Sequence, residues 1–168
     1  MSKTFAMQVM FAVGAALLLM GAVAAEDQAV DWNAFQSAKV SLAKGLAAAR
    51  SSGKPISGKY EMEDGKLQLS VYTASKGKFS EVIVDHASGK VAKTERIKEG
   101  EDLSHAVEQS KAMAKARRSL NAAVAKAVAE NPGYRAVSVV PSLEQGKPVA
   151  TVVLENPAGT KTSPQKLD

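Results

Sequence analysis

Apolar residues recur with a helical period in two parts of the chain, and each part precedes a group of strand-like segments. The first part, Trp32 to Arg50, carries an apolar stripe among many alanines, and Asp31 stands where an N-cap is expected. The residues after it, Ser51 to Pro55, include the Gly and Pro that end helices. The second part runs from Leu103 to Glu130. The pattern therefore predicts two helices, each followed by a small sheet.

Short segments that alternate apolar and polar residues predict the strands. Val82 and Val84 are expected on one face of their strand, and Asp64-Gly65 suits a tight hairpin turn. Lys90 to Ile97 is polar and has the charges of an edge strand. The other predicted strands span residues 56–62, 67–72, 79–84, 135–140, 147–155 and 160–163.

Two stretches of the chain read alike, VIVDHASGKV at 82–91 and VVLENPAGTK at 152–161. Each is an apolar run, then an acid, then a turn with glycine at the same offset. We interpret these acids and glycines as structural, because a carboxylate accepts turn amides and glycine supplies backbone freedom. The turn residues are Asp85 and Gly89 in the first stretch and Glu155 and Gly159 in the second.

A helix and strands ending in V-D-x-x-(S/T)-G-K-V, here Val84 to Val91, resemble the PepSY domain. The resemblance spans Trp32 to Ile97, and it is weaker from Leu120 to Thr162, where Glu155 replaces the Asp. It implies an α+β fold of two PepSY-like units, each a helix packed on a small antiparallel sheet. It also implies an exported, non-enzymatic protein that binds a protein or peptide partner and restrains a peptidase.

The N-terminus has the three parts of a secretory signal. Lys3 is the only charge in the first twenty-five residues, an apolar run fills 9–20, and small residues lead to cleavage after Ala24 or Ala25. An uncleaved anchor is the alternative, since 5–25 nearly reaches the length of a membrane span. We expect a periplasmic or secreted protein. The predicted division is a signal peptide at 1–25, a lead-in at 26–31, a first unit at 32–98, a second unit with a long N-terminal helix at 99–163, and a flexible tail at 164–168.

The residue types present argue against enzyme chemistry. The chain has no Cys, so disulfides, thiol catalysis and Cys-based metal sites are excluded. Its two histidines, His86 and His105, are far apart, and it has neither a G-x-S-x-G motif nor a glycine-rich phosphate loop. We therefore expect no catalytic residue, no cofactor and no metal site.

Four residues are candidates for partner contact. Tyr72 is out of phase with Leu69 and Val71, which predicts an exposed ring on the sheet that contacts a partner. The edges of the sheet are a second place for contact, where an extended peptide adds as a strand. The basic residues Lys111, Lys115 and Arg118 lie at helical spacing. They indicate either an ordinary solvent face or a stripe that contacts anionic lipid or wall polymer.

Two further kinds of ligand have little support in the sequence. The chain is 5% aromatic and has a net charge of +5, and so few rings to stack bases argue against nucleic acid. A groove between the two units that carries a small ligand or metal is the third alternative, although no convergent set of ligating residues supports it.

Overall fold

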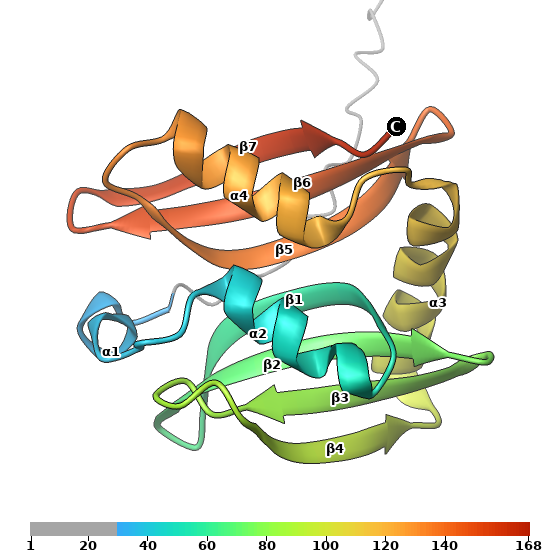
Figure 1. Ribbon diagram of the computed structural model, residues 1–168, viewed down its shortest axis with the longest axis horizontal. Helices are drawn as coiled ribbons and strands as arrows, with labels where there is room; N and C mark the ends of the chain where they lie inside the picture. Colours follow the sequence, from blue (N-terminus) through green and yellow to red (C-terminus); the bar gives the residue numbers. More distant parts are fainter. Residues whose placement is uncertain (1–29) are drawn as a thin grey trace, which may run out of the picture.

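The computed structural model describes residues 30–168, whose strands form one antiparallel sheet (Figure 1). The order of its seven strands is β4-β3-β2-β1-β5-β6-β7. The predicted signal peptide and most of the lead-in lie outside the described residues. The strands are β1 (Lys54–Glu63), β2 (Lys66–Ser75), β3 (Lys78–Val84), β4 (Val91–Ile97), β5 (Arg135–Glu144), β6 (Lys147–Asn156) and β7 (Gly159–Lys166).

The predicted pair of units, each with its own small sheet, is wrong. The first strand of each half, β1 and β5, pair antiparallel, with Gly58 opposite Val139 and Lys59 opposite Ser138. Both strands hold four consecutive buried residues, 55–58 and 136–139, so they are covered on both faces. Pairing them satisfies backbone groups that two separate sheets would leave at buried edges. The first half (residues 30–98) and the second half (99–168) therefore share one sheet.

Each predicted long helix is two helices. The first contains α1 (Trp32–Gln36) and α2 (Leu42–Ala48), which continues into the short 3₁₀ turn η1 (Ala49–Ser51). The second contains α3 (Gly100–Lys115) and α4 (Leu120–Glu130). Serines begin the second helix of each pair: Ser41 Oγ accepts from the Lys44 amide at 3.3 Å and Ser119 Oγ from the Ala122 amide at 3.2 Å. A serine that caps a new helix cannot also continue the previous one.

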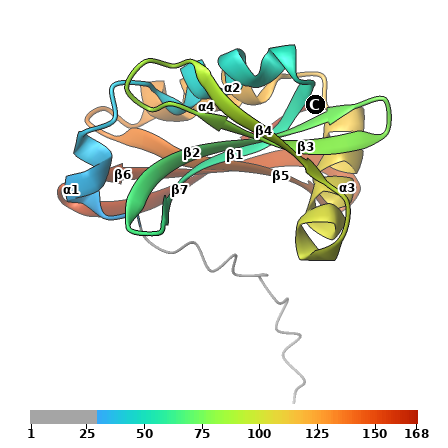
Figure 2. The same cartoon turned by 90° about the horizontal axis from the view of Figure 1, so that it is seen from below.

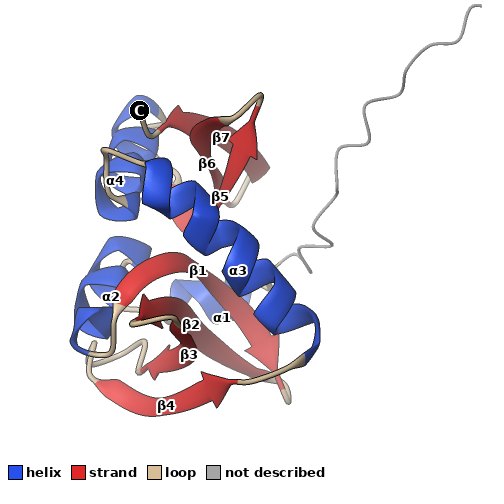
Figure 3. Cartoon of the chain, turned by 90° about the vertical axis from the view of Figure 1, so that its right-hand side faces the viewer, coloured by secondary structure: helices blue, strands red, loops and turns tan. Residues whose placement is uncertain are grey.

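The helices lie on opposite faces of the sheet. Figure 2 shows α2 and α4 on one side and α3 on the other, and Figure 3 shows α3 running from the first half to the second. Two neighbouring residues of β1 contact helices on opposite faces of the sheet. A methyl group on Gly58 would lie 3.0 Å from Leu46 Cδ2 of α2, whereas Ser57 Oγ donates to Gln109 Oε1 of α3 at 2.7 Å.

One hydrophobic core joins the halves beneath α2 and α4. Leu42 and Leu46 of α2 and Leu120 and Val124 of α4 are buried in the same cluster. Asn121 Nδ2 also donates to the Ala43 carbonyl at 2.6 Å, which links the two helices directly. The fully buried strand residues of this core include Leu69, Val71, Val82, Val84, Val139, Val152 and Leu154. The predicted alternation of Val82 and Val84 with the less buried Ile83 is confirmed.

The halves repeat, but not where the two similar stretches suggest. The equivalent features are the hairpin turns, in which Asp64-Gly65 have φ of 48° and 73° and Gln145-Gly146 have 50° and 79°. The stretch 82–91 begins on β3, the third strand of its half, whereas 152–161 begins on β6, the second strand. The match between those stretches therefore reflects strand-and-turn composition and not equivalent positions.

The predicted flexible tail, 164–168, is wrong. The strand β7 extends to Lys166, and the Leu167 side chain has 0% exposure. The Leu167 amide donates to the Pro148 carbonyl at 3.0 Å, and its own carbonyl accepts from Arg117 and Arg118 amides at 2.7 and 3.0 Å. Within residues 30–168, no helix is both long and apolar enough to cross a membrane.

Candidate functional site

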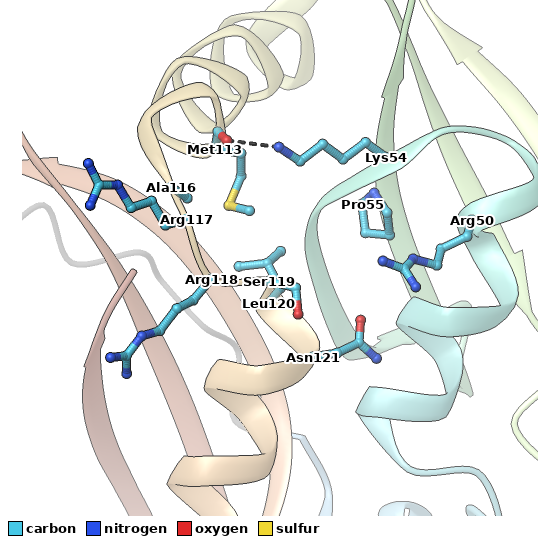
Figure 4. A pocket seen from close by; sticks show the side chains of 10 residues that line it. All are labelled: Arg50, Lys54, Pro55, Met113, Ala116, Arg117, Arg118, Ser119, Leu120 and Asn121. Atoms are coloured by element: carbon cyan, nitrogen blue, oxygen red, sulfur yellow. Dashed lines mark hydrogen bonds between the residues drawn. The ribbon is translucent and has the colours of Figure 1, made fainter. Parts of the chain in front are cut away.

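A pocket of about 170 Å³ lies where the end of α2, the start of β1 and the link between α3 and α4 meet (Figure 4). Elements from both halves of the chain build it. That volume exceeds the roughly 30 Å³ of one water several times, so the pocket accommodates a group of several heavy atoms. Its lining residues are Arg50, Lys54, Pro55, Met113, Ala116, Arg117, Arg118, Ser119, Leu120 and Asn121.

The pocket is strongly basic. Four of its lining residues are cations, and none of the ten is acidic. Arg50, Arg117 and Arg118 are exposed, and with the described residues 30–168 none of them forms a salt bridge. An anion that entered here would therefore meet guanidinium groups that are not paired at salt-bridge distance with any carboxylate of this part of the chain, although Asp168 follows the Leu167 carbonyl that accepts from the Arg117 and Arg118 amides.

Local structure fixes where the cations stand. Lys54 begins β1, and its Nζ donates to the Met113 carbonyl at 2.8 Å, so it caps the C-terminal end of α3. The main chain of Arg117 and Arg118 is anchored by their amides on the Leu167 carbonyl. Their side chains remain exposed, and in Figure 4 they extend away from Arg50 and Lys54.

The N-terminus of α4 opens on the same pocket. Ser119, its N-cap, and the first two helical residues, Leu120 and Asn121, all line the cavity. The Ser119 hydroxyl satisfies the Ala122 amide and leaves the amides of the first helical residues facing outward. The positive end of the helix dipole therefore adds to the charge of the side chains.

The predicted basic stripe is broken by the end of α3. Lys111 and Lys115 are exposed on α3, but this helix ends at Lys115, and Arg118 lies in the link to α4. Only Arg118 of the three lines the pocket, while Lys115 Nζ donates to the Gly146 carbonyl at 3.4 Å. Arg50 and Lys54 could not be predicted as site residues from the sequence, because no local signal connects residues near the end of the first helix to a link that follows residue 115.

The prediction that Tyr72 is exposed is wrong. It does alternate with Leu69 and Val71, but its ring is half-buried and packs against the hydrophobic core, and α3 contacts β2 on the side of the sheet away from α2. Burial, with the nearby carboxylate of Glu81 opposite it, raises the pKa of Tyr72. Burial also raises the pKa of Glu81. The Tyr72 ring therefore packs partly against the hydrophobic core, and its role in partner contact stays a prediction.

The acids of the two similar stretches have different roles. Asp85 Oδ1 accepts from the amides of Ala87 and Ser88 at 3.2 and 2.6 Å, and Gly89 has φ of 77°. Hydrogen bonds from Ser88 hold the pKa of Asp85 below its usual value. This is the structural turn that the sequence indicates.

The second acid, Glu155, is buried within β6 and does not form a turn. Its Oε1 accepts from Thr160 Oγ1 at 3.2 Å, while its Oε2 has no partner among residues 30–168. Burial raises the pKa of Glu155. Gly159, with φ of 133°, begins β7 directly after the turn.

Within the described residues, no cluster of three His, Asp or Glu side chains is arranged to hold a metal ion. No protein-family model, no curated protein and no solved structure matches the chain. The resemblance to the PepSY domain therefore stays a prediction that rests on the residues quoted for it.

Proposed function

We propose that the protein is a binding module whose ligand carries negative charge and is held at the basic pocket between the two halves. The observation that carries this proposal is that four cationic residues and no acidic residue line the cavity, with Arg50 and Lys54 on one side and the side chains of Arg117 and Arg118 extending away on the other. Charged groups at a surface are usually interspersed with counter-charges, so a one-sign lining is a feature that a function must explain.

The type of side chain in the pocket supports binding rather than catalysis. Its lining supplies guanidinium and ammonium groups, a hydroxyl and an amide, but no His, Asp, Glu or Cys. Ser119 and Lys54 are residue types that can act as nucleophiles, but the lining has no His, Asp or Glu to activate them, and both are hydrogen-bonded to the main chain, Ser119 Oγ to the Ala122 amide and Lys54 Nζ to the Met113 carbonyl. Guanidinium groups instead match the planar oxygens of phosphates and carboxylates through paired hydrogen bonds.

The size of the pocket indicates that it receives one group of a ligand. Pockets that enclose a whole drug-sized molecule have volumes of roughly 300–1,000 Å³, and this cavity has about 170 Å³. A phosphate or carboxylate group fits this space, while the remainder of the ligand stays on the surface. The proposal therefore favours contact with an anionic envelope component over enclosure of a free metabolite.

The test is a titration with inorganic pyrophosphate at low salt, followed by calorimetry and by amide shifts in NMR spectra. We expect saturable binding that weakens as salt rises, with the largest amide shifts at Leu120 and Asn121. Arg50→Gln should lose most of the affinity. The matched control is Lys66→Gln, which removes one exposed charge from the first residue of β2, outside the pocket. Equal binding by the two variants, or shifts scattered over the whole surface, would contradict the proposal.

A second candidate is a protein or peptide partner, such as a peptidase, that adds a strand to β4. The observation in its favour is that β4 is an edge strand with six of its seven residues exposed, including Val91 at 38%. It ranks second because β4 also carries the Lys93–Glu95 ion pair, at 2.7 Å, and such charges normally protect an edge.

Successive amides of a strand point to opposite sides, which permits a sharp test of strand addition. Of Lys93→Pro and Thr94→Pro, one removes an outward amide without breaking a bond to β3. Extended peptides selected on the wild-type protein should lose binding to that variant while its stability stays near wild type. Unchanged peptide binding by both proline variants would contradict strand addition at β4.

A further inference from the structure

The cations of the pocket do not converge on one point. Arg50 and Lys54 reach it from the end of α2 and the start of β1, and in Figure 4 Arg117 and Arg118 extend away on the other side. A single compact anion between Arg50 and Lys54 would leave the two other guanidinium groups without a counter-charge. The pocket is therefore the centre of a basic track and not a closed cage.

We infer that the ligand is a linear polyanion that places one charged group in the pocket and others along Arg117 and Arg118. This inference rests on the proposed function and names its ligand class. Repeated charges on a flexible chain match cations that are spread over a surface, because each additional contact is made without a second loss of translational freedom. Release of counterions from the polymer adds to the affinity at low salt.

A polymer fits the surroundings better than a membrane does. Proteins that lie on bilayers usually combine basic residues with apolar side chains that insert among the lipids. The exposed large apolar residues within 30–168 are Val91 and Leu143, and neither lines the pocket. The lining also has no aromatic ring on which a base would stack, which argues against single-stranded nucleic acid.

The ligand would also connect the two halves of the chain. Arg50 and Lys54 belong to the first half, and Arg117 and Arg118 precede α4 in the second. Lys54 Nζ on the Met113 carbonyl already joins the halves at this point. A bound polyanion should therefore raise the unfolding temperature of the whole domain, as any ligand that binds only the folded state does.

The experiment compares orthophosphate, tripolyphosphate and long-chain inorganic polyphosphate at equal total phosphate, by calorimetry and thermal unfolding. We expect affinity per chain to rise by about a hundredfold from the shortest to the longest ligand, with a steeper salt dependence for the longest. Arg118→Gln should weaken the long chain and leave orthophosphate unchanged, whereas Arg50→Gln should weaken both. The double variant Lys66→Gln/Lys90→Gln, which removes two exposed charges outside the pocket, should resemble wild type.

The outcomes separate this inference from the proposed function. Equal affinity for orthophosphate and polyphosphate would overturn the inference of a polyanionic ligand but would leave the proposed anion-binding function intact. Failure of every phosphate species to bind would overturn both the inference and the proposed function. Stronger binding to vesicles of anionic phospholipid than to polyphosphate would overturn the polymer in favour of a membrane. Stronger binding to an oligothymidylate than to polyphosphate with the same number of charges would contradict the argument against base contacts and would identify the polyanion as a nucleic acid. Binding of poly-glutamate with the same dependence on Arg118 would support the polyanion and identify carboxylate as an acceptable charge.

Discussion

The guanidinium of Arg135 lies 4.3 Å from the centre of the Phe35 ring, although the two residues are 100 positions apart. Its two terminal nitrogens donate to the carbonyls of Phe35 and Ala38 at 3.2 and 2.8 Å. One side chain at the start of β5 thus satisfies the C-terminal end of α1 and stacks on its only buried residue. The contact attaches the first helix of one half to the first strand of the other.

Replacing Arg135 with methionine should destabilise the protein by about 2–3 kcal/mol, because two charge-assisted hydrogen bonds to partly buried carbonyls are lost. Urea unfolding followed by circular dichroism measures this change. The control is Arg96→Met on β4, which is exposed and should change stability by less than about 0.5 kcal/mol. Similar values for the two variants would show that Arg135 does not attach α1.

Tyr60→Phe should cost about 1–3 kcal/mol, since the Tyr60 hydroxyl donates to the buried Val40 carbonyl, which would lose its partner. Burial, partly offset by the nearby charge of Arg135, raises the pKa of Tyr60 to about 12. Because the folded state holds this proton more tightly, the wild type should lose stability as pH rises from about 10, the usual tyrosine pKa, to about 12. Unfolding measured across that range should show a weaker pH dependence in Tyr60→Phe. An unchanged slope would exclude Tyr60 as its source.

Glu155→Gln should raise stability at pH 7, because burial raises the pKa of Glu155 and ionisation in the folded state is unfavourable. The sign follows from linkage: the folded state binds the proton more tightly, so the wild type loses stability as pH rises above the usual Glu pKa of about 4.3. The gain from the neutral side chain should therefore be present at pH 7 and absent at pH 3.

Glu130 provides the opposite sign as a control for Glu155. Hydrogen bonds from Lys126 and Gln165 lower the pKa of Glu130, so its ionised form stabilises the fold and this contribution disappears as pH falls through the lowered pKa. Glu130→Gln should therefore lose stability at neutral pH while Glu155→Gln gains it. A loss in both variants would mean that the Thr160 hydrogen bond to Glu155, at 3.2 Å, outweighs the cost of burial.

Ser119 allows capping and anion binding to be separated. Ser119→Ala should lose about 1 kcal/mol, because the Ala122 amide loses its partner. Ser119→Asp keeps the cap, so its stability should stay near wild type, but its carboxylate occupies the basic pocket and should abolish pyrophosphate binding. The matched pair at Ser41, which caps α2 and does not line the pocket, should reproduce the stability changes without any effect on binding. Retained binding in Ser119→Asp would remove the N-terminus of α4 from the proposed site.

The hairpin turn at Asp64-Gly65 could be predicted because its chemistry is local. Asp64 and Gly65 both have positive φ, a conformation that a two-residue turn requires and that glycine adopts without strain. The turn at Asp85 is similarly local, since its side chain bonds to amides two and three residues further on. Such features depend on a few neighbouring residues, so the sequence is sufficient to locate them.

Helix boundaries and exposure were predicted less well, because both depend on packing. The alanine-rich period runs through Ser119, and only the docking of α4 on the sheet makes that serine a cap rather than an interior residue. The alternation at Tyr72 correctly placed its ring on the opposite side from Leu69, but it contains no information about what packs against that ring.

The sequence by itself determined which segments become strands, where most of them turn and which side chains face the main core. Only the tertiary structure decided that β1 and β5 pair into one sheet, and that Arg50 and Lys54 meet the link containing Arg118. Alternation of apolar and polar residues specifies the face of the sheet to which a side chain points. It does not specify which distant strand forms hydrogen bonds with the backbone at a strand's edge. That choice depends on burying both central strands at once, and the basic pocket is a consequence of the same joining of the two halves.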